Sequence, residues 1–289
     1  MASSSHSFSP SSSNSRVAVV TGSSSGIGYE TSLMLARNDF ITYATMRNPN
    51  KSGNIKSIAA RENLPIRTAK LDVTDDVSIN NAVQTILSET GRIDILVNNA
   101  GYVLNGAVED LAMDEIKAQY ETNVFGLIKT TQAVLPTMRK QKSGIIVNIS
   151  SVAGRFGYPG GSAYISTKFA VEGLSESMAY ELEPFGIKVI LIEPGVTRTN
   201  VFNSVVVAKK SQDPNSPYSK IMQKMATSFE GMMKNSSSPE VVAKVVLEAV
   251  TNESPALRYL SGKDAETWLD AKRNLSDGEF YKMMKQNLM

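Results

Sequence analysis

Short apolar runs alternate with longer amphipathic stretches along most of this chain. The apolar runs are bounded by glycine, proline or polar residues, which is typical of strands buried inside a sheet. We expect seven strands, at residues 17–21, 40–46, 66–71, 93–97, 144–150, 186–192 and 256–260.

The stretches between the strands have apolar residues at helical spacing. We expect helices at residues 29–38, 74–91, 114–139, 163–183 and 264–275, and one that starts at 238–240. Thr74 is expected to cap the second helix and Gly91 to end it. Strands that alternate with helices favour right-handed crossovers. The pattern therefore predicts an α/β fold with a Rossmann-type, doubly wound, parallel seven-stranded sheet in three layers.

Two segments depart from this rhythm. Residues 1–15 are rich in serine and are expected to be a disordered tail. A short transit peptide is the alternative, although Arg16 supplies the only positive charge. Residues 200–237 interrupt the alternation and contain several methionines. This segment is predicted to form either a small helical, apolar substrate lid or a pair of packed surface helices. Residues 16–289 are otherwise expected to form one domain.

Composition excludes several classes of chemistry. The chain has no cysteine, and its only histidine, His6, lies in the serine-rich tail. Thiolate chemistry, a multi-histidine metal site and a Ser-His-Asp triad are therefore not expected. The formal charge of +2 does not favour nucleic acid as a partner. No apolar run approaches the ~20 residues of a membrane span, and we expect a cytoplasmic protein.

A glycine-rich turn follows the first strand. Gly22-Ser-Ser-Ser-Gly26-Ile-Gly28 connects that strand to the first helix. Glycines allow a tight turn and a close approach of the backbone, and a helix N-terminus favours phosphate. We therefore expect a nucleotide phosphate site here. A turn that is merely glycine-rich is the alternative.

Arg47 lies just after the second strand, where an NAD site usually offers an acid to the ribose. No acid occurs between residues 40 and 50. A guanidinium at this point favours the 2′-phosphate of NADP(H), and a hydroxyl of Ser23 or Ser24 could contact the same phosphate. Alternatively, Arg47 is a solvated loop residue.

The ends of other strands also carry polar or turn residues. Asp72, Asn98, Ser151 and Pro194 lie at or just after strand ends. In a parallel sheet these ends meet at one edge, where ligands bind. The asparagines at 98 and 99 could fix a turn or contact a ribose; their spacing does not distinguish the two.

Tyr164 and Lys168 are the candidate acid–base pair. They lie four residues apart in a predicted helix and therefore share one face. An ammonium next to a phenol favours the phenolate, so we expect a lowered pKa for Tyr164. Ser151 could bind a substrate oxygen beside the phenol.

These motifs together resemble those of the short-chain dehydrogenase/reductase family, in its shorter branch. The resemblance rests, in order, on Thr21-Gly-Ser-Ser-Ser-Gly-Ile-Gly28, Asp72-Val73, Asn98-Asn-Ala-Gly101, Asn123, Ser151, Tyr164-x-x-x-Lys168 and Pro194-Gly195. It implies that Tyr164 is the acid/base, and that Lys168 lowers its pKa and binds the nicotinamide ribose. It also implies that Ser151 contacts the substrate oxygen and that Asn123 belongs to a proton relay.

The motifs and the resemblance also predict the nucleotide site. The resemblance implies that Asp72 contacts the adenine side of the cofactor, Asn98 the ribose region and Thr199 the nicotinamide carboxamide. The full set of expected positions, besides Tyr164 and Lys168, is Gly22, Ser23, Ser24, Gly26, Ile27, Gly28, Arg47, Asp72, Val73, Asn99, Ala100, Gly101, Pro194, Gly195, Val196 and Thr199. Members of the family are commonly homodimers or homotetramers, so we expect such an assembly.

The sequence thus predicts an NADP(H)-dependent oxidoreductase that acts on a ketone or secondary alcohol. Leu257-Arg-Tyr-Leu-Ser-Gly-Lys-Asp264 resembles hydroxysteroid- and retinol-dehydrogenase-like members, which suggests a lipophilic substrate. Two alternatives remain. One is a 3-oxoacyl-thioester reductase with Lys209, Lys210, Lys220 and Lys224 near the cleft, and the other is a non-catalytic NADP(H)-binding sensor.

Overall fold

The computed structural model describes residues 15–198, 205–234 and 236–289. The main sheet is built from β1 (Val17–Val20), β2 (Ile41–Met46), β3 (Ile66–Lys70), β4 (Ile95–Asn98), β6 (Gly144–Ile149), β7 (Ile187–Pro194) and β9 (Arg258–Ser261). The principal helices are α1 (Gly26–Ala36), α2 (Gly53–Glu62), α3 (Asp76–Thr90), α4 (Met113–Tyr120), α5 (Gly126–Gln141), α6 (Ser162–Leu182), α7 (Ser219–Lys234), α8 (Pro239–Thr251), α9 (Lys263–Asn274) and α10 (Asp277–Leu288).

The seven strands form one sheet in the order β3-β2-β1-β4-β6-β7-β9. Every neighbouring pair is parallel. The order reverses between β1 and β4, which is the crevice where ligands bind in sheets of this type. The predicted parallel, seven-stranded, doubly wound sheet is therefore confirmed.

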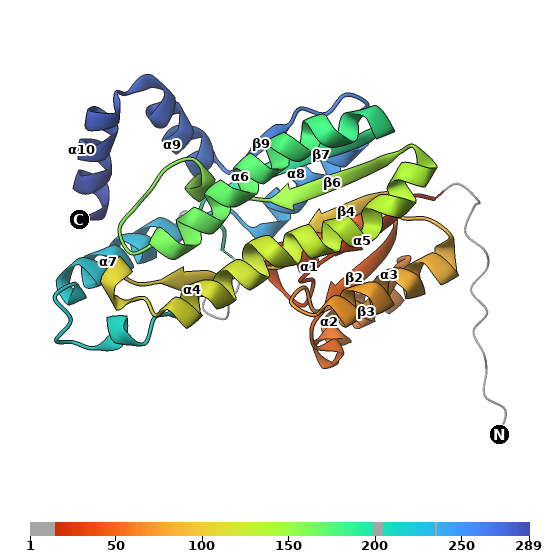
Figure 1. Cartoon of the computed structure of the whole chain (residues 1–289), viewed down its shortest axis with the longest axis horizontal. Helices are drawn as coiled ribbons and strands as arrows, with labels where there is room; N and C mark the ends of the chain where they lie inside the picture. The colour runs from red at the N-terminus through yellow and green to blue at the C-terminus, as the bar shows by residue number, and fades with distance from the viewer. Residues whose placement is uncertain (1–14, 199–204, 235) are drawn as a thin grey trace.

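Helices cover both faces of the sheet and make three layers (Figure 1). Successive side chains of a strand point to opposite faces. In β1, Ala18 and Val20 pack in the cluster that contains α1 and α8. Val17 and Val19 pack in the opposite cluster, with residues of α3, α5 and α6. Both faces of the strands are buried, which explains the continuous apolar runs in the sequence.

Several helix boundaries differ from those predicted. α1 begins at Gly26 rather than at residue 29, because the glycine-rich turn continues directly into the helix. Asp75, not Thr74, caps α3: its Oδ1 accepts from the amides of Val77 and Ser78 at 2.9 and 3.1 Å. The predicted helix at 114–139 consists of α4 and α5 with a π-helical turn between them, at Glu121–Phe125.

The part of 200–237 that is described contains a strand and a helix. β8 (Val205–Val207) pairs with β5 (Val103–Asn105) in a small parallel sheet that the sequence pattern did not predict. Strands of three residues are too short to show a periodic pattern. α7 packs against α10, and Met225 is buried with Phe156, Leu269, Phe280 and Met284. Residues 200–204 and the tail at 1–14 lie outside the described residues.

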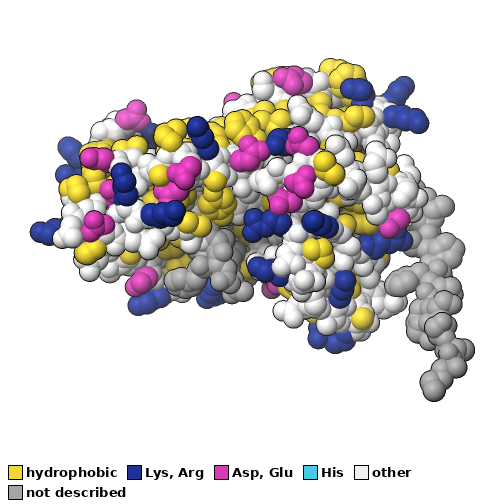
Figure 2. All heavy atoms as spheres, turned by 60° about the horizontal axis from the view of Figure 1, so that its bottom comes forward, with side chains coloured by type: hydrophobic (Ala, Val, Ile, Leu, Met, Phe, Trp, Pro, Cys, Tyr) yellow, Lys and Arg dark blue, Asp and Glu magenta, His cyan; other side chains and the backbone are white. Residues whose placement is uncertain are grey.

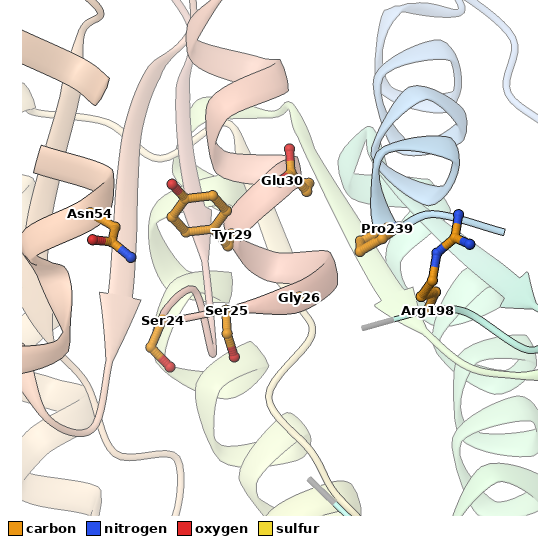
Figure 3. Close-up of a pocket in the computed structure, with 8 residues that line it drawn as sticks. All are labelled: Ser24, Ser25, Gly26, Tyr29, Glu30, Asn54, Arg198 and Pro239. Carbon is orange, nitrogen blue, oxygen red and sulfur yellow. The ribbon is translucent and has the colours of Figure 1, made fainter. Parts of the chain in front are cut away.

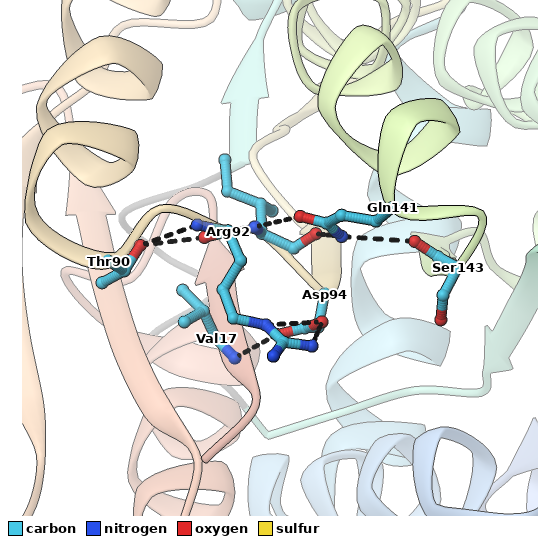
Figure 4. Close-up of polar contacts among 7 residues, drawn as sticks. Val17, Thr90, Arg92, Asp94, Gln141 and Ser143 are labelled. Carbon is cyan, nitrogen blue, oxygen red and sulfur yellow. Dashed lines mark hydrogen bonds and ion pairs between the residues drawn. The ribbon is translucent and has the colours of Figure 1, made fainter. Parts of the chain in front are cut away.

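A polar network fixes the amino-terminal edge of the sheet (Figure 4). The buried Asp94 carboxylate accepts from the Val17 amide at 2.7 Å and from Arg92 Nη2 at 2.7 Å. Gln141, at the end of α5, exchanges two hydrogen bonds with the backbone of Ile93. These contacts join β1, β4 and α5 at the edge opposite the strand ends that carry the candidate site.

The surface is mixed in charge. Figure 2 shows basic and acidic side chains interspersed over the described residues of the face that it presents. Among the described helices, none is long and apolar enough to cross a membrane. The described residues also contain no group of three or more acidic or histidine side chains placed to bind a metal ion.

Candidate active site

The glycine-rich turn after β1 forms a cradle of backbone. Gly22 and Gly26 have φ angles of +69° and +63°, in the left-handed region that favours glycine. A Cβ atom at Gly28 would lie 2.4 Å from Asn99 Nδ2 and 2.7 Å from the Gly22 carbonyl oxygen. These positions therefore require glycine, for conformation at the first two and for space at the third.

Asn99 and Thr21 hold this turn in place. Asn99 Nδ2 donates to the carbonyl oxygens of Thr21 and Gly22, at 2.8 and 3.2 Å. The Thr21 hydroxyl in return accepts from the amides of Asn99 and Ala100, both at 3.0 Å. The predicted asparagine at 99 thus fixes the backbone of the turn. Asn98 is buried and donates to Thr131 and Asn148, so its side chain joins strands and helix rather than facing a ribose.

A cavity of about 280 Å³ opens at the N-terminus of α1. Ser24 and Ser25 line it from the turn, and Arg198 and Pro239 line it from the opposite side (Figure 3). Tyr29, Glu30 and Asn54 complete the lining. A helix N-terminus with free backbone amides and a nearby cation suits the phosphates of a dinucleotide, so these residues fit the nucleotide that the motif predicts.

Ser23 differs from its expected role. The residue is fully buried, and its hydroxyl donates to the Val20 carbonyl oxygen at 2.9 Å. The same hydroxyl accepts from Ser32 Oγ at 3.0 Å, and the Ser23 amide donates to Thr45. Its polar groups are therefore used inside the protein, and the suggested hydroxyl contact with a ribose 2′-phosphate is wrong for Ser23. Ser24 lies at the cavity and keeps that possibility.

Arg47 and Asp72 lie at the ends of β2 and β3. Arg47 is exposed, and its guanidinium makes no hydrogen bond or ion pair within the described part of the chain. The Asp72 carboxylate accepts from the amide and hydroxyl of Thr74, at 3.0 and 2.8 Å. Val73 is buried against Gly126, while Ile27 packs at the rim of the core. Of these residues, Arg47 is the one whose charged group has no partner among the described residues.

Tyr164, Lys168 and Ser151 come together at the carboxyl edge of the sheet. Lys168 Nζ lies 5.6 Å from the centre of the Tyr164 ring, on the same face of α6. It donates to the carbonyl oxygen of Ile149, the last residue of β6, at 2.8 Å. Ser151 begins the next loop, and its hydroxyl accepts from the Ala153 amide at 3.1 Å. Tyr164 and Lys168 are partly exposed, so a ligand can reach them.

The pKa values of this pair differ from the expectation. Burial raises the pKa of the Tyr164 phenol to about 12, and the Ser151 hydroxyl acts in the opposite direction. Burial also lowers the pKa of Lys168 to about 8, against the charge of Glu172. The predicted lowering of the Tyr164 pKa by Lys168 is therefore wrong. Loss of solvation outweighs the ammonium, which bonds to Ile149 instead.

Asn123 lies in the π-helical turn between α4 and α5. Its side chain is buried, accepts from the Tyr102 amide at 3.1 Å and donates to the Tyr102 carbonyl oxygen at 2.9 Å. It also donates to Thr167, on the helix of Tyr164, at 3.2 Å. π-turns inside helices often occur at functional sites. Asn123 thus ties the loop after β4 to α6.

The loop after β7 completes the edge. Pro194 ends β7, and Gly195 and Val196 follow it; the Ser151 hydroxyl donates to the Pro194 carbonyl oxygen at 3.4 Å. Thr199 lies outside the described residues, so its predicted contact with the carboxamide is not addressed. Two carboxylates at this edge were not predicted from the sequence: Asp264 accepts a hydrogen bond from the Val196 amide, and Glu172 lies buried one turn after Lys168.

Comparison with known proteins agrees with this geometry. Residues 16–210 match the family model of the short chain dehydrogenases. The uncharacterized oxidoreductase YusZ of Bacillus subtilis is 39% identical over 86% of this chain and 90% of its own. The 3-ketodihydrosphingosine reductase of Bacteroides thetaiotaomicron is 36% identical over 86% and 88%. Human 17-beta-hydroxysteroid dehydrogenase type 1 is 34% identical over 85% and 77%.

Solved structures show the same architecture. A short-chain dehydrogenase from Streptomyces avermitilis superposes with a TM-score of 0.81 and 33% identity, over 94% of this chain and 97% of its own. ElxO with NADP bound has a TM-score of 0.72 at 28% identity, over 88% and 100%. The family model covers more than half of the chain, so this protein is a member of the short-chain dehydrogenase/reductase family of oxidoreductases.

Proposed function

We propose that this protein is an NADP(H)-dependent oxidoreductase that interconverts a lipophilic ketone and the corresponding secondary alcohol. The proposal rests on one observation. Tyr164, Lys168 and Ser151 lie together at the carboxyl edge of the sheet, the same edge at which the glycine-rich turn follows β1.

The three side chains divide the acid–base work. When bound, the nicotinamide supplies the hydride to the carbonyl carbon, or accepts it from the alcohol. In the direction of reduction, Tyr164 donates its phenolic proton to the carbonyl oxygen, so that the new C–H and O–H bonds complete the alcohol. The raised pKa of Tyr164 keeps this proton on the phenol near neutral pH until it is transferred. Ser151 Oγ is placed to bond to the same oxygen.

Arg47 and the cavity at α1 support NADP(H) as the cofactor. The guanidinium of Arg47 is exposed and unpaired among the described residues, at the end of β2. A planar guanidinium can form paired hydrogen bonds with a phosphate. The structure of ElxO contains NADP, which is consistent with this choice in the family.

Apolar side chains near the catalytic loop support a lipophilic substrate. Phe156 and Val152 of that loop pack with Met225 and Met232 of α7. Met222 reaches Gly160, where a Cβ atom would lie 2.8 Å from its sulfur. Two relatives are named for a ketosphingoid and a hydroxysteroid reaction. We infer that α7 and the segment before it form a substrate lid, in which methionines adapt to an irregular apolar ligand.

A 3-oxoacyl-thioester reductase is the second candidate. Lys209, Lys210, Lys220 and Lys224 are all exposed, on the segment that leads into α7 and on α7 itself. A basic surface of this kind suits the phosphates of an acyl carrier or of a coenzyme A thioester. A substrate screen that follows the absorbance of NADPH separates the candidates when it contains steroid and sphingoid ketones, acetoacetyl thioesters and small aldehydes. A protein that binds NADPH and turns over none of them would be a sensor.

Tyr164→Phe tests the assigned chemistry. The variant keeps the ring and loses only the proton donor, so we expect unchanged NADPH affinity and a kcat at least about a hundredfold lower. The measurements are NADPH fluorescence titration and turnover with the best substrate of the screen. Tyr180→Phe, on an exposed part of α6, is the matched control. If Tyr164→Phe keeps more than about a tenth of the activity with chemistry rate-limiting, Tyr164 is not the acid.

A further inference from the structure

The last strand of the sheet and the helix after it hold the loop that follows β7. Pro194 pairs with Ser261 of β9, and the Gly195 amide donates to the Ser261 carbonyl oxygen at 2.9 Å. The next amide, of Val196, donates to Asp264 Oδ2 at 2.6 Å. A bond from a backbone amide to a carboxylate is charge-assisted and among the stronger hydrogen bonds in proteins.

Two glycines make room for the Asp264 carboxylate. A Cβ atom at Gly195 would lie 2.3 Å from Asp264 Oδ2. A Cβ atom at Gly262 would lie 2.6 Å from Asp264 Oδ1, and Gly262 has a φ of +102°. The carboxylate therefore lies between the glycine of the cofactor loop and the glycine before α9. A side chain at either glycine would therefore displace the Asp264 carboxylate.

Local helix capping does not account for this arrangement. Asp264 is in the first turn of α9, where a carboxylate usually accepts from amides of its own helix. Here the N-cap residue is Gly262, which has no side chain, and the Asp264 carboxylate accepts from an amide outside α9, that of Val196. Val196 and Asp264 are 68 residues apart in sequence, so the contact joins the C-terminal part of the chain to the catalytic edge.

We propose that Asp264 is a positioning residue for the nicotinamide end of the cofactor. Its carboxylate fixes the backbone at Gly195 and Val196, so that these two residues are already in place when the dinucleotide binds. Ordering a flexible loop on binding costs free energy, and a preformed loop avoids that cost. This inference rests on the proposed function, because it assumes that the loop faces a bound nicotinamide.

The test compares wild type with Asp264→Ala and Asp264→Asn. We expect Asp264→Ala to raise the NADPH Kd about tenfold, the loss of about one charge-assisted bond. Asn retains an acceptor oxygen of the same shape, so the Kd of Asp264→Asn should lie between the other two. Hydrogen exchange of the cofactor-free proteins should show faster exchange of the Val196 amide in Asp264→Ala. Asp270→Ala, on the exposed side of α9, is the matched control and should change neither quantity.

Three outcomes decide the matter. If Asp264→Ala lowers the melting temperature but leaves the NADPH Kd and the Val196 exchange rate unchanged, Asp264 is only structural and the inference is overturned. If wild type itself binds neither NADPH nor NADH, the proposed function fails, while the exchange rate at Val196 still tests the contact. If Asp264→Ala does not fold, the inference is tested with a double-mutant cycle of Gly195→Ala and Asp264→Asn.

A double-mutant cycle completes the test. Gly195→Ala should weaken NADPH binding because the new methyl group displaces the carboxylate. Asp264→Asn by itself already weakens NADPH binding. Gly195→Ala should therefore raise the Kd of that variant by less than it raises the Kd of wild type. Strictly additive effects on the Kd would mean that Gly195 and Asp264 act independently, and would overturn the inference.

Discussion

Arg47 and Lys168 are both basic residues at the carboxyl edge, but their surroundings give them different chemistry. Lys168 is partly buried, bonds to Ile149 and has a pKa lowered to about 8 by burial. Its ammonium is thus already engaged by backbone and partly desolvated. Arg47 is exposed and unpaired within the described residues. Its charge is available to a ligand outside the fold, which suits a phosphate rather than a proton transfer.

The Arg47 guanidinium can be tested by cofactor preference. We expect Arg47→Ala to weaken NADPH binding by about ten- to a hundredfold, since a charge-assisted bond contributes roughly 1.5–3 kcal/mol. NADH binding should change little because NADH lacks the 2′-phosphate. Arg47→Asp should go further and favour NADH. Kd values for both cofactors measure the ratio, and Lys51→Ala controls for a general loss of positive charge.

Two results would contradict the NADP(H) assignment. One is a wild-type protein that binds NADH as tightly as NADPH. The other is a cofactor ratio that neither Arg47→Ala nor Arg47→Asp changes, which would leave Arg47 as a solvated surface residue.

At the scale of elements, the two edges of the sheet serve different purposes. At the amino edge, Asp94, Arg92 and Gln141 bond to each other or to nearby backbone, and their polar groups are satisfied. At the carboxyl edge, the glycine-rich turn, Tyr164 and Arg47 keep groups available to a ligand. The topology causes this division, because parallel strands place all their carboxyl ends at one edge.

Asp94→Ala is expected to affect stability and not the site. The substitution leaves the buried Val17 amide without its acceptor, which should cost about 2–3 kcal/mol of the free energy of unfolding. Urea denaturation measures the loss, and the NADPH Kd of the folded variant should equal that of wild type. Asp270→Ala, whose partner Arg273 is also mostly exposed, should cost less than about 0.5 kcal/mol. A similarly small cost for Asp94→Ala would mean that water replaces the carboxylate.

At the scale of the whole molecule, α6 presents aromatic side chains to solvent. Phe169 and Tyr180 are 48% and 80% exposed, and Phe125, just before α5, is 47% exposed. Phe169 and Tyr180 are eleven residues apart and lie on one side of the helix. Gly173, between them, has open space around it. Large aromatic residues exposed along one helix face are typical of a protein interface.

We therefore expect a homodimer or homotetramer assembled through α6. Tyr180→Glu should shift the mass measured by light scattering toward the monomer, because a buried unpaired carboxylate is costly at an interface. Tyr281→Glu, on the 67% exposed Tyr281 of α10, is the control and should leave the mass unchanged. A wild-type protein that is monomeric at micromolar concentration would contradict the interface.

The sequence by itself determined the fold class and the elements on which the candidate residues lie. Continuous apolar runs separated by helical patterns predicted the seven parallel strands, because local period and length reflect burial on both faces. The spacing of Gly22, Gly26 and Gly28 predicted the cradle, since glycine is favoured at the backbone angles of the first two and leaves the space needed at the third. Tyr164 and Lys168 were predicted to share a face because four residues make about one helical turn.

The tertiary structure decided what each of these groups can do. Ser23 follows a glycine like a ligand-binding serine, but contacts with Val20 and Ser32 occupy its hydroxyl. The pKa of Tyr164 is raised rather than lowered, because the loss of solvent around it depends on neighbours from other elements. The contact between Asp264 and Val196 spans 68 residues and has no local pattern. Periodicity reports which face of an element is buried, whereas partners and solvation arise only when distant segments pack together.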